Sequence, residues 1–372
     1  MNGIYAKLLE HMNRQPFLLP HPLLPSGVEI LRQLYTEDQA ELLTHLTAVP
    51  DTPDSIARRA GRAEEMVATM LDDMARRGLV FAAGDENLRL YGLFPFLPGL
   101  YEFQFAGKLE QLSPNAPTLA QLFKQYYYEG LGREAAILYS MSDAGTRKVR
   151  IIAVDRQIPH ESNALPHERA AEIVKQQCNI ALINCYCRSA AVVRGEPCKL
   201  NGPLDVCLLF GPIARYAIEY GHGRKIDMKE ALAILGRCEE AGLIHTASNC
   251  KEPMVICNCC SCCCGNLKGL SYFAPPGRVV KSRFEPSIDL EACTGCGECA
   301  SRCQLSALVI DEFPRVDAER CIGCALCADV CAAGALAMVE RKDADEIEHE
   351  NYLDLSMHVA RSRKMFEGGT PD

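Results

Sequence analysis

The spacing of apolar residues along the first hundred positions predicts several short helices followed by a hairpin of two strands. Apolar side chains recur there every three or four residues, which is the period of an amphipathic helix. The predicted helices span 27–35, 37–47, 52–61 and 62–80. The segment 81–93 then places the turn-forming residues Gly84 and Asn87 between two apolar stretches, a pattern typical of a strand, a turn and a second strand. This order of elements predicts a winged helix-turn-helix in residues 26–100.

Beyond residue 101 the pattern changes to an alternation of strand and helix signals. The predicted strands span 149–159, 179–187, 206–211 and 254–260, and the predicted helices span 117–132, 166–178, 211–221 and 227–242. Asp227 and Glu230 stand at the two positions of a capping box. Three consecutive tyrosines, 126–128, are expected to pack a core with the aromatic face of their helix. We therefore expect a small α/β domain whose strand ends deliver cysteine side chains.

The C-terminal quarter contains an internal repeat with a period of 28 residues. Residues 287–310 align without gaps on residues 315–338. Besides four cysteines, the matched pairs include Asp289/Asp317, Glu291/Glu319, Gly295/Gly323 and Ala307/Ala335. The fold class predicted from these patterns is α+β multidomain. Its predicted parts are a winged helix-turn-helix domain at 1–100, a small α/β cysteine-rich domain at 101–280, a domain built from the repeat at 281–340 and a charged helical tail at 341–372.

Composition and charge narrow the class of protein. The chain has 372 residues and a net charge of −9, which excludes a strongly basic nucleic-acid binder. The sequence contains no apolar run long enough to span a membrane and no secretory leader, so we expect a cytoplasmic protein without a membrane span. Its 21 cysteines all fall between Cys178 and Cys331. Clustered cysteines in a chain of this size indicate metal binding rather than a disulfide framework, and they favour a reducing, anaerobic cell.

The spacing of the last eight cysteines indicates two [4Fe-4S] clusters. Each repeat has the pattern Cys-x2-Cys-x2-Cys-x3-Cys, in which the fourth cysteine reaches the cluster of the other repeat. We therefore expect cluster one to be bound by Cys293, Cys296, Cys299 and Cys331, and cluster two by Cys321, Cys324, Cys327 and Cys303. Two zinc sites are the disfavoured alternative, because zinc sites usually pair two separate Cys-x-x-Cys units.

These motifs resemble those of bacterial dicluster ferredoxins over about 55 residues, and the resemblance implies a ferredoxin-like dicluster domain at 281–340. The resemblance implies transfer of single electrons between two cubane clusters. One departure concerns the residue after each fourth cysteine, usually proline in ferredoxins, which is Gln304 or Ala332 here. Residues 281–372 carry 10 basic and 18 acidic residues, a net charge of −8. This negative charge should oppose reduction and lower the potential of the clusters.

A second group of cysteines lies in the middle of the chain. The candidate metal ligands form two sets, the first being Cys185, Cys187, Cys198 and Cys207 and the second being Cys257, Cys259, Cys260 and Cys263. Adjacent cysteines on a strand point to opposite faces, so not all of the run 257–264 can bind one metal. We favour an additional iron–sulfur cluster, and a zinc site, a redox-active thiol array and buried structural cysteines remain alternatives. Cys178, Cys238 and Cys250 stand alone and are expected to be small core residues.

The whole chain also resembles a family of iron–sulfur proteins from anaerobic bacteria that join a winged-helix domain to a ferredoxin domain. The resemblance rests on the runs 184–188 and 256–265 and implies an architecture but no settled activity. The favoured function is electron transfer through two clusters and a further one to a partner oxidoreductase. A redox-sensing regulator and a reductase with a substrate-binding cluster are alternatives, and whether the chain is itself an enzyme stays open.

The candidate recognition helix at 62–80 bears on the regulator alternative. It carries more acidic than basic residues. DNA phosphates attract the opposite balance of charge, so we expect no DNA binding. The N-terminal domain is instead expected to dock a partner or to form a homodimer.

Overall fold

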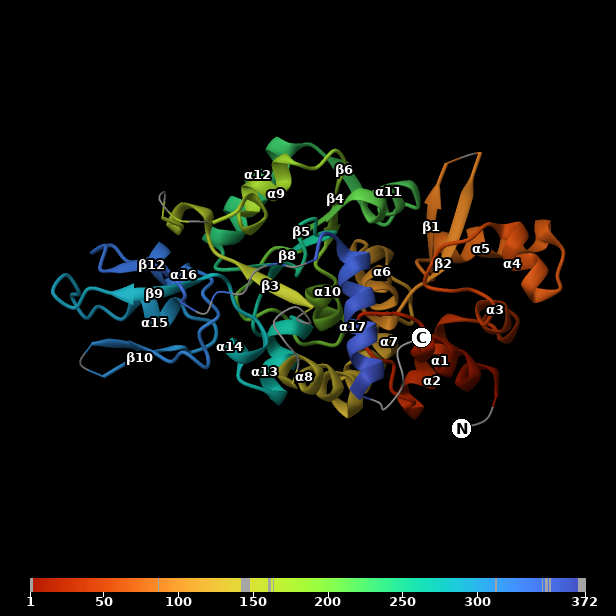
Figure 1. The fold of residues 1–372 in the computed structure, drawn as a ribbon, viewed down its shortest axis with the longest axis horizontal. Helices are drawn as coiled ribbons and strands as arrows, with labels where there is room; N and C mark the ends of the chain where they lie inside the picture. Colours follow the sequence, from red (N-terminus) through yellow and green to blue (C-terminus); the bar gives the residue numbers. More distant parts are fainter. Residues whose placement is uncertain are drawn as a thin grey trace.

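The computed structural model describes residues 3–85, 87–141, 148–159, 162, 164–311, 313–342, 344, 347 and 349–366, with the backbone alone at 138–141, 270 and 363–366. The N-terminal helices lie at one end of the molecule, the C-terminal repeat lies at the other, and a six-stranded sheet lies between them (Figure 1). One connected set of buried apolar side chains runs through all three parts. The domain boundaries at 100, 280 and 340 therefore stay predictions. Among the described residues, no helix is long and apolar enough to cross a membrane.

The N-terminal part has the four predicted helices and the predicted hairpin, preceded by one helix, α1, that the sequence pattern did not predict. Its elements are α1 (Ile4–Arg14), α2 (Pro25–Leu34), α3 (Glu37–Leu43), α4 (Pro53–Ala60), α5 (Glu64–Arg76), β1 (Val80–Gly84) and β2 (Arg89–Leu93). The Thr52 side chain caps α4 by accepting from the Ser55 amide at 3.3 Å, and Gly61 ends this helix in the left-handed conformation. The assignment of these elements to a winged helix stays a prediction.

One side of α5 packs against the middle of the chain. The Tyr216 hydroxyl donates to the Ala75 carbonyl oxygen at 2.9 Å, and the Tyr220 hydroxyl donates to Asp72 at 3.2 Å. Arg89 at the start of β2 forms an ion pair with Glu219 at 2.5 Å. The candidate recognition helix, for which the sequence predicts no DNA binding, is therefore partly covered by another part of the same chain.

The middle of the chain folds into a sheet with the strand order β3-β7-β8-β5-β4-β6. The strands are β3 (Val149–Ile152), β4 (Ile180–Asn184), β5 (Asp205–Phe210), β6 (Arg224–Ile226), β7 (Ile244–Ser248) and β8 (Val255–Cys259). All neighbouring pairs are antiparallel. Because β4 and β8 both pair with β5, they run in the same direction and end at the same edge of the sheet, where β5 begins. The two cysteine-bearing strands are thus separated by a third strand, which itself carries Cys207.

Helices alternate with the strands of this sheet along the chain, and further helices precede its first strand. They are α9 (Ala170–Lys175), α10 (Tyr186–Val193), α11 (Gly211–Glu219) and α12 (Met228–Glu240), preceded by α6 (Tyr101–Phe105), α7 (Ala116–Tyr126) and α8 (Gly132–Met141). Short turns of 3₁₀ or π type lie at Phe96–Leu100, Leu109–Gln111, Tyr127–Leu131, Asp155–Gln157, Pro166–Glu168 and Gly265–Gly269. Tyr126 is fully buried, as predicted, and Tyr127 donates from its hydroxyl to the Gly265 carbonyl oxygen at 3.0 Å.

Several predictions for the middle segment need correction. The strand predicted at 179–187 ends at Asn184, and a new helix begins directly after Cys185, so that Cys187 lies on a helix. Only half of the predicted capping box forms, because Asp227 accepts from the Glu230 amide while the Glu230 carboxylate pairs with Arg224. Cys178 is exposed rather than a core residue, whereas Cys238 and Cys250 are fully buried.

The C-terminal repeat forms two small two-stranded sheets. Its elements are β9 (Phe284–Ile288), α15 (Glu298–Arg302), β10 (Leu308–Ile310), β11 (Pro314–Val316), α16 (Leu326–Asp329) and β12 (Leu336–Glu340), preceded by α13 (Leu270–Phe273) and α14 (Pro276–Val279). Strand β9 pairs with β12, and β10 pairs with β11. The first and last strands of the repeat thus pair with each other.

The charged tail forms a helix, α17 (Tyr352–Phe366), and one part of this helix is buried rather than exposed to solvent. Leu355 and Val359 on α17 are fully buried. The chain just before α17 hydrogen-bonds with the segment after β7, because the Lys251 amide donates to the His349 carbonyl oxygen at 2.9 Å. The tail therefore packs against the middle of the chain, as Figure 1 shows.

Candidate metal centres

The two halves of the repeat share their backbone conformation as well as their sequence. Three positions in each half adopt positive φ angles, and they form the pairs Gly295/Gly323 (69° and 71°), Gly297/Ala325 (78° and 69°) and Ser306/Gly334 (51° and 64°). Left-handed residues are uncommon outside glycine, so three coincidences at a spacing of 28 residues reflect one loop built twice.

The matched aspartates and alanines of the repeat form equivalent hydrogen bonds between its two halves. The side chains of Asp289 and Asp317 each accept a hydrogen bond from the amide two residues further on, at 2.9 and 3.0 Å. Their own amides donate to the other half of the repeat. Asp289 donates to the carbonyl oxygen of Ala335, and Asp317 to that of Ala307, each at 2.8 Å. Each half therefore holds the turn before the first cysteine of the other half.

The eight cysteines of the repeat divide between two cavities. The first cavity is lined by Cys293, Cys296, Cys299 and Cys331, and the second by Cys303, Cys321, Cys324 and Cys327. Each cavity thus takes three cysteines from one half and the fourth from the other. Four thiol side chains around one cavity fit the donor set of a cubane, and the Ala307 amide donates to the Cys303 sulfur at 3.2 Å.

The two cavities differ in their surroundings. Cys296 of the first is exposed, and the acidic residues Glu291 and Glu298 beside it are exposed as well. The second cavity faces the sheet, where the Val154 amide donates to the Cys324 carbonyl oxygen at 3.2 Å. Burial raises the pKa of the Cys324 thiol to about 12, so its thiolate needs a positively charged partner such as iron. We call these the outer and the inner cluster cavities.

The comparisons with known proteins agree with this geometry. Residues 286–309 and residues 313–336 each match a family model described as a 4Fe-4S binding domain. The C-terminal part of the chain is therefore a dicluster ferredoxin module. No curated protein and no solved structure matches the chain.

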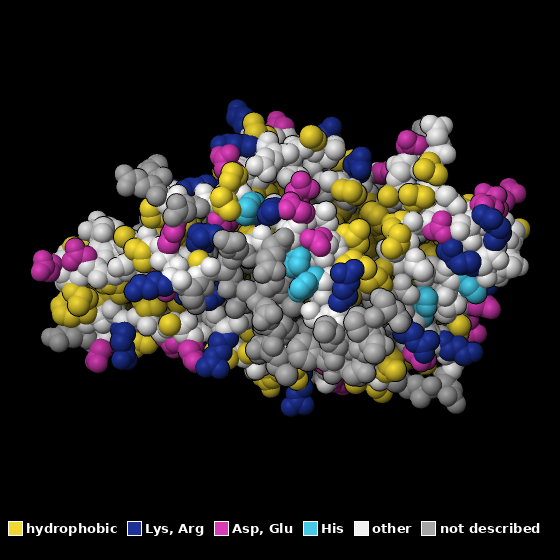
Figure 2. Space-filling view, in the orientation of Figure 1, with side chains coloured by type: hydrophobic (Ala, Val, Ile, Leu, Met, Phe, Trp, Pro, Cys, Tyr) yellow, Lys and Arg dark blue, Asp and Glu magenta, His cyan; other side chains and the backbone are white. Residues whose placement is uncertain are grey.

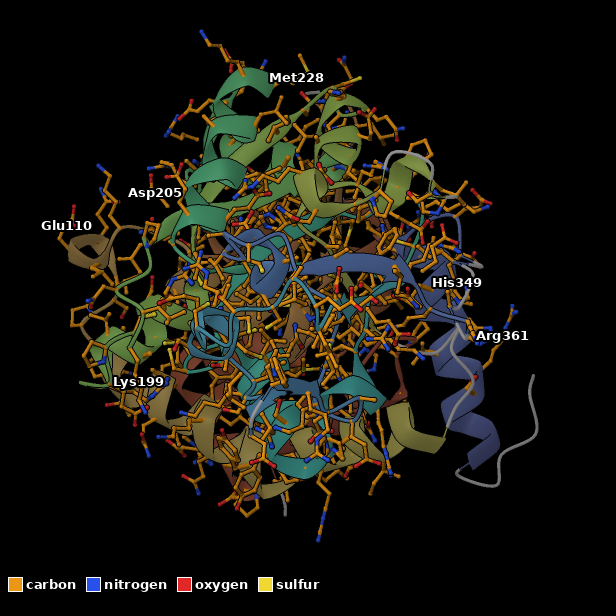
Figure 3. The ribbon with its side chains drawn as sticks, turned by 90° about the vertical axis from the view of Figure 1, so that its left-hand side faces the viewer. Glu110, Lys199, Asp205, Met228, His349 and Arg361 are labelled. Carbon is orange, nitrogen blue, oxygen red and sulfur yellow. The ribbon has the colours of Figure 1, made fainter. Side chains whose placement is uncertain are left out.

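Ten further cysteines gather at the edge of the sheet where β4 and β8 end. Figure 3 marks this side of the molecule by Asp205, the first residue of β5, and by Lys199, next to Cys198, while His349 and Arg361 lie on the opposite side. The ten cysteines form two groups. The first, which we call the four-cysteine group, contains Cys198, Cys260, Cys262 and Cys263. The second, which we call the buried group, contains Cys185, Cys187, Cys207, Cys257, Cys259 and Cys264, all of them buried.

The buried group follows the strands. Cys207 on β5 lies within hydrogen-bonding reach of Cys185 at the end of β4 and of Cys257 on β8. Cys264 donates to Cys259 at 3.3 Å. It also lies within hydrogen-bonding reach of Cys187. The contacts thus run in succession from Cys185 through Cys207, Cys257, Cys259 and Cys264 to Cys187. In contrast, all four sulfur atoms of the four-cysteine group lie within 4.8 Å of one another.

Alternation along β8 separates the two groups. Cys257 and Cys259 are two residues apart and belong to the buried group, whereas Cys260 belongs to the other group. This agrees with the expectation that adjacent cysteines of the run cannot face the same way. The structure nevertheless divides the cysteines differently from the predicted sets, because it joins Cys198 to the run after β8. It also adds Cys262 and Cys264, whose positions follow from the turn after β8 and carry no distinct sequence signal.

A buried arginine lies between the two groups. Arg188 is 1% exposed, and its Nη1 donates to the Asn258 carbonyl oxygen at 3.0 Å and lies 3.9 Å from the Cys260 sulfur. Burial works against its charge, but the thiolates of Cys185, Cys207 and Cys260 outweigh this effect and raise the pKa of the guanidinium. Among the described residues, its Nε and Nη2 atoms have no hydrogen-bond partner. Sequence reasoning missed this residue, although it follows directly after Cys187.

A cavity of about 60 Å³ adjoins the buried group. Cys187 and Cys257 line one part of it, and the side chains of Glu102, Lys148 and Tyr186 line another. Glu102 is 8% exposed and accepts from the Gly99 amide at 2.6 Å. Burial raises the pKa of Glu102 to about 7, so near neutral pH this carboxyl group is able to give or take a proton.

Two glycines of the ferredoxin module give a matched test of the inner cavity. A Cβ atom on Gly323 would lie 1.9 Å from the Phe284 carbonyl oxygen, so we expect Gly323→Ala to lose the inner cluster, about four irons per chain. Gly297→Ala is the control, because its Cβ would meet nothing within 4 Å and its repeat counterpart is already Ala325. The control should cost only about 1–2 kcal/mol from the left-handed backbone. Iron analysis of both variants checks this, and full iron content in Gly323→Ala would contradict it.

Proposed function

We propose that this protein relays single electrons between redox partners, through the two [4Fe-4S] clusters and a further metal centre in the middle of the chain. The observation that carries the proposal is the pair of four-cysteine cavities in the ferredoxin module, one of which faces the cysteine-rich sheet edge. We propose as ligands of the outer cluster Cys293, Cys296, Cys299 and Cys331, and as ligands of the inner cluster Cys303, Cys321, Cys324 and Cys327.

The outer cluster is the proposed point of contact with a partner oxidoreductase. Cys296 is exposed there, which shortens the path for an electron to a docked protein. Glu291 and Glu298 supply negative charge, and the nearby Leu290 side chain is 54% exposed. Acidic and apolar side chains occur together at this end of the molecule in Figure 2. A partner with a basic rim around an apolar patch fits this surface, and the encounter should weaken with salt.

The buried group is the proposed site of the additional iron–sulfur cluster. Six buried thiols whose contacts run in succession suit a cofactor larger than a single ion. Hydrogen bonds from Cys207 and Cys259 lower the pKa of Cys257 and so favour a thiolate at this position. We also propose that the protein works in a reducing cytoplasm, because its 21 cysteines form no disulfide bond and the proposed clusters are sensitive to oxygen.

The proposed role of the N-terminal part is docking or homodimer formation by a winged helix, rather than DNA binding. All five arginines of α4, α5 and their flanks pair with acidic residues. Arg76, for example, lies 2.9 Å from Asp72, one turn away on α5. The acidic partners offset the positive charge that these arginines would offer to phosphates, and a face of α5 is already covered by Tyr216 and Tyr220.

A reductase is the second candidate function, and the cavity beside the buried group favours it. Glu102 would supply a proton and the further cluster an electron to a small molecule held there. The two candidates differ in whether this cluster has an iron that is open to an external ligand. Carbon monoxide added to the reduced protein should change the spectrum of the further cluster in a reductase and should leave it unchanged in a pure relay.

The first prediction from the proposed function concerns iron. Anaerobically purified protein should contain about twelve irons with matching sulfide, and the reduced form should give paramagnetic resonance signals of two interacting cubanes. Cys257→Ser should lower iron and sulfide by about four each and spare these signals. Cys178→Ser is the matched control, because Cys178 is exposed and belongs to neither group. Fewer than about eight irons in fresh wild-type protein would refute the relay itself.

The second prediction concerns DNA. Because α4 and α5 present paired arginines, the protein should give no sequence-specific shift with DNA from its own upstream region in an electrophoretic assay. The measurement is made with oxidised and with reduced protein, since a redox-sensing regulator would bind in only one state. A specific, salt-sensitive shift in either state would favour the regulator.

A further inference from the structure

The four-cysteine group has the dimensions of a site for one metal ion. The Cys198 sulfur lies 3.6 Å from that of Cys260 and 3.7 Å from that of Cys262, and the sulfur atoms of Cys262 and Cys263 are 3.7 Å apart. Four thiolates arranged tetrahedrally at about 2.3 Å from a zinc ion lie roughly 3.8 Å from one another. The sulfides and irons of a cubane would hold the same thiolates farther apart. The measured separations therefore match a single ion.

The local backbone supports thiolates at these positions. Three of the four cysteines lie in the turn that follows β8, and the fourth lies in the loop between α10 and β5. The amides of Leu200 and Gly202 point toward the Cys198 sulfur. Amide dipoles directed at sulfur are a common way in which proteins stabilise metal-bound thiolates.

Arg188 supplies a second, independent sign of a charged occupant. A divalent ion with four thiolates carries a net charge of −2, and an arginine buried to 1% exposure requires a negative partner. Its guanidinium lies 3.9 Å from the Cys260 sulfur, and Nε and Nη2 have no hydrogen-bond partner among the described residues. A metal–thiolate centre beside it would balance this charge, whereas four neutral thiols would not.

The four-cysteine group is also joined to the inner cluster cavity. Ser261, between two of the cysteines, donates from its amide to the Gln304 side chain at 2.7 Å. Gln304 directly follows Cys303 and also donates to the Gly242 carbonyl oxygen. Proline, usual in ferredoxins after the fourth cysteine, has no amide side chain that could make these bonds. The departure from the ferredoxin pattern thus has a structural role at this junction.

We propose that Cys198, Cys260, Cys262 and Cys263 bind one tetrahedral metal ion of the thiolate-seeking class, zinc or iron, which Gln304 connects to the inner cluster through Ser261. This site is separate from the additional iron–sulfur cluster proposed for the buried group. An iron ion would serve as a one-electron step beside the inner cluster, and a zinc ion would fix the ferredoxin module against the sheet.

The test measures metal and sulfide together on the full chain. Wild-type protein should hold either one zinc ion or one iron in excess of its acid-labile sulfide, and X-ray absorption at that metal's edge should show four sulfur ligands at about 2.3 Å. Cys198→Ser should lose this one ion without loss of sulfide. Cys198→His retains a ligand and should keep the ion with one nitrogen in its shell. Cys178→Ser should change nothing.

Two other results would overturn the proposal. Loss of about four irons with four sulfides in Cys198→Ser would mean a cluster at this site and would overturn the proposal. Wild-type protein without zinc and with equal iron and sulfide would overturn it as well. Neither result would touch the relay function, which depends on the ferredoxin clusters. Gln304→Leu should keep the ion but slow the reduction of an iron centre, or lower the melting temperature of the zinc form.

Discussion

Mutual repulsion between thiolates is the constraint on which most of this structure depends. Ten cysteines meet at one edge of the sheet, and eight more surround the two cavities of the ferredoxin module. Sulfur atoms less than 4 Å apart cannot all carry charge unless a cation lies between them. With metal bound at these cysteines as proposed, the folding of this half of the molecule would be coupled to metal binding, since the metal would supply the charge that allows the chain to close. The buried guanidinium of Arg188 supplies a positive charge from the protein itself, which also offsets the charge of the thiolates.

The parts predictable from sequence were those built by local repetition. The gapless period of 28 residues identified the ferredoxin motifs, and the structure gives the matched Asp289 and Asp317 equivalent turns. Helical periodicity also located helices α2 to α5 of the N-terminal part, whereas α1 was not predicted. The middle of the chain was harder because its cysteines are brought together by strand order. Nothing in the sequence indicates that β5 lies between β4 and β8, or that the chain turns into a helix directly after Cys185.

The grouping of the middle cysteines shows why spacing alone failed there. Cys198 lies in a loop that crosses to the turn after β8, a contact across more than sixty residues. Sequence proximity had placed it with Cys185 and Cys187 instead. Alternation on β8 was the one local rule that applied, and in the structure Cys259 and Cys260 lie in different groups, although the predicted second set contained both. The grouping of the middle cysteines thus depends on tertiary contacts between distant segments. The ferredoxin cysteines, in contrast, lie in a short motif whose local sequence also forms the loop that holds them.

The exchange of the fourth cysteine between the two halves of the repeat has an evolutionary consequence. Each cavity closes with a residue from the opposite half, and each half also receives the other's aspartate amide on an alanine carbonyl. A polypeptide with only one copy of the 28-residue unit would lack the closing ligand and could complete its cavity only by associating with a second identical polypeptide about a twofold axis. Duplication within one chain makes that association permanent, and it frees the two copies to diverge, as Ala325 opposite Gly297 and Gln304 opposite Ala332 illustrate.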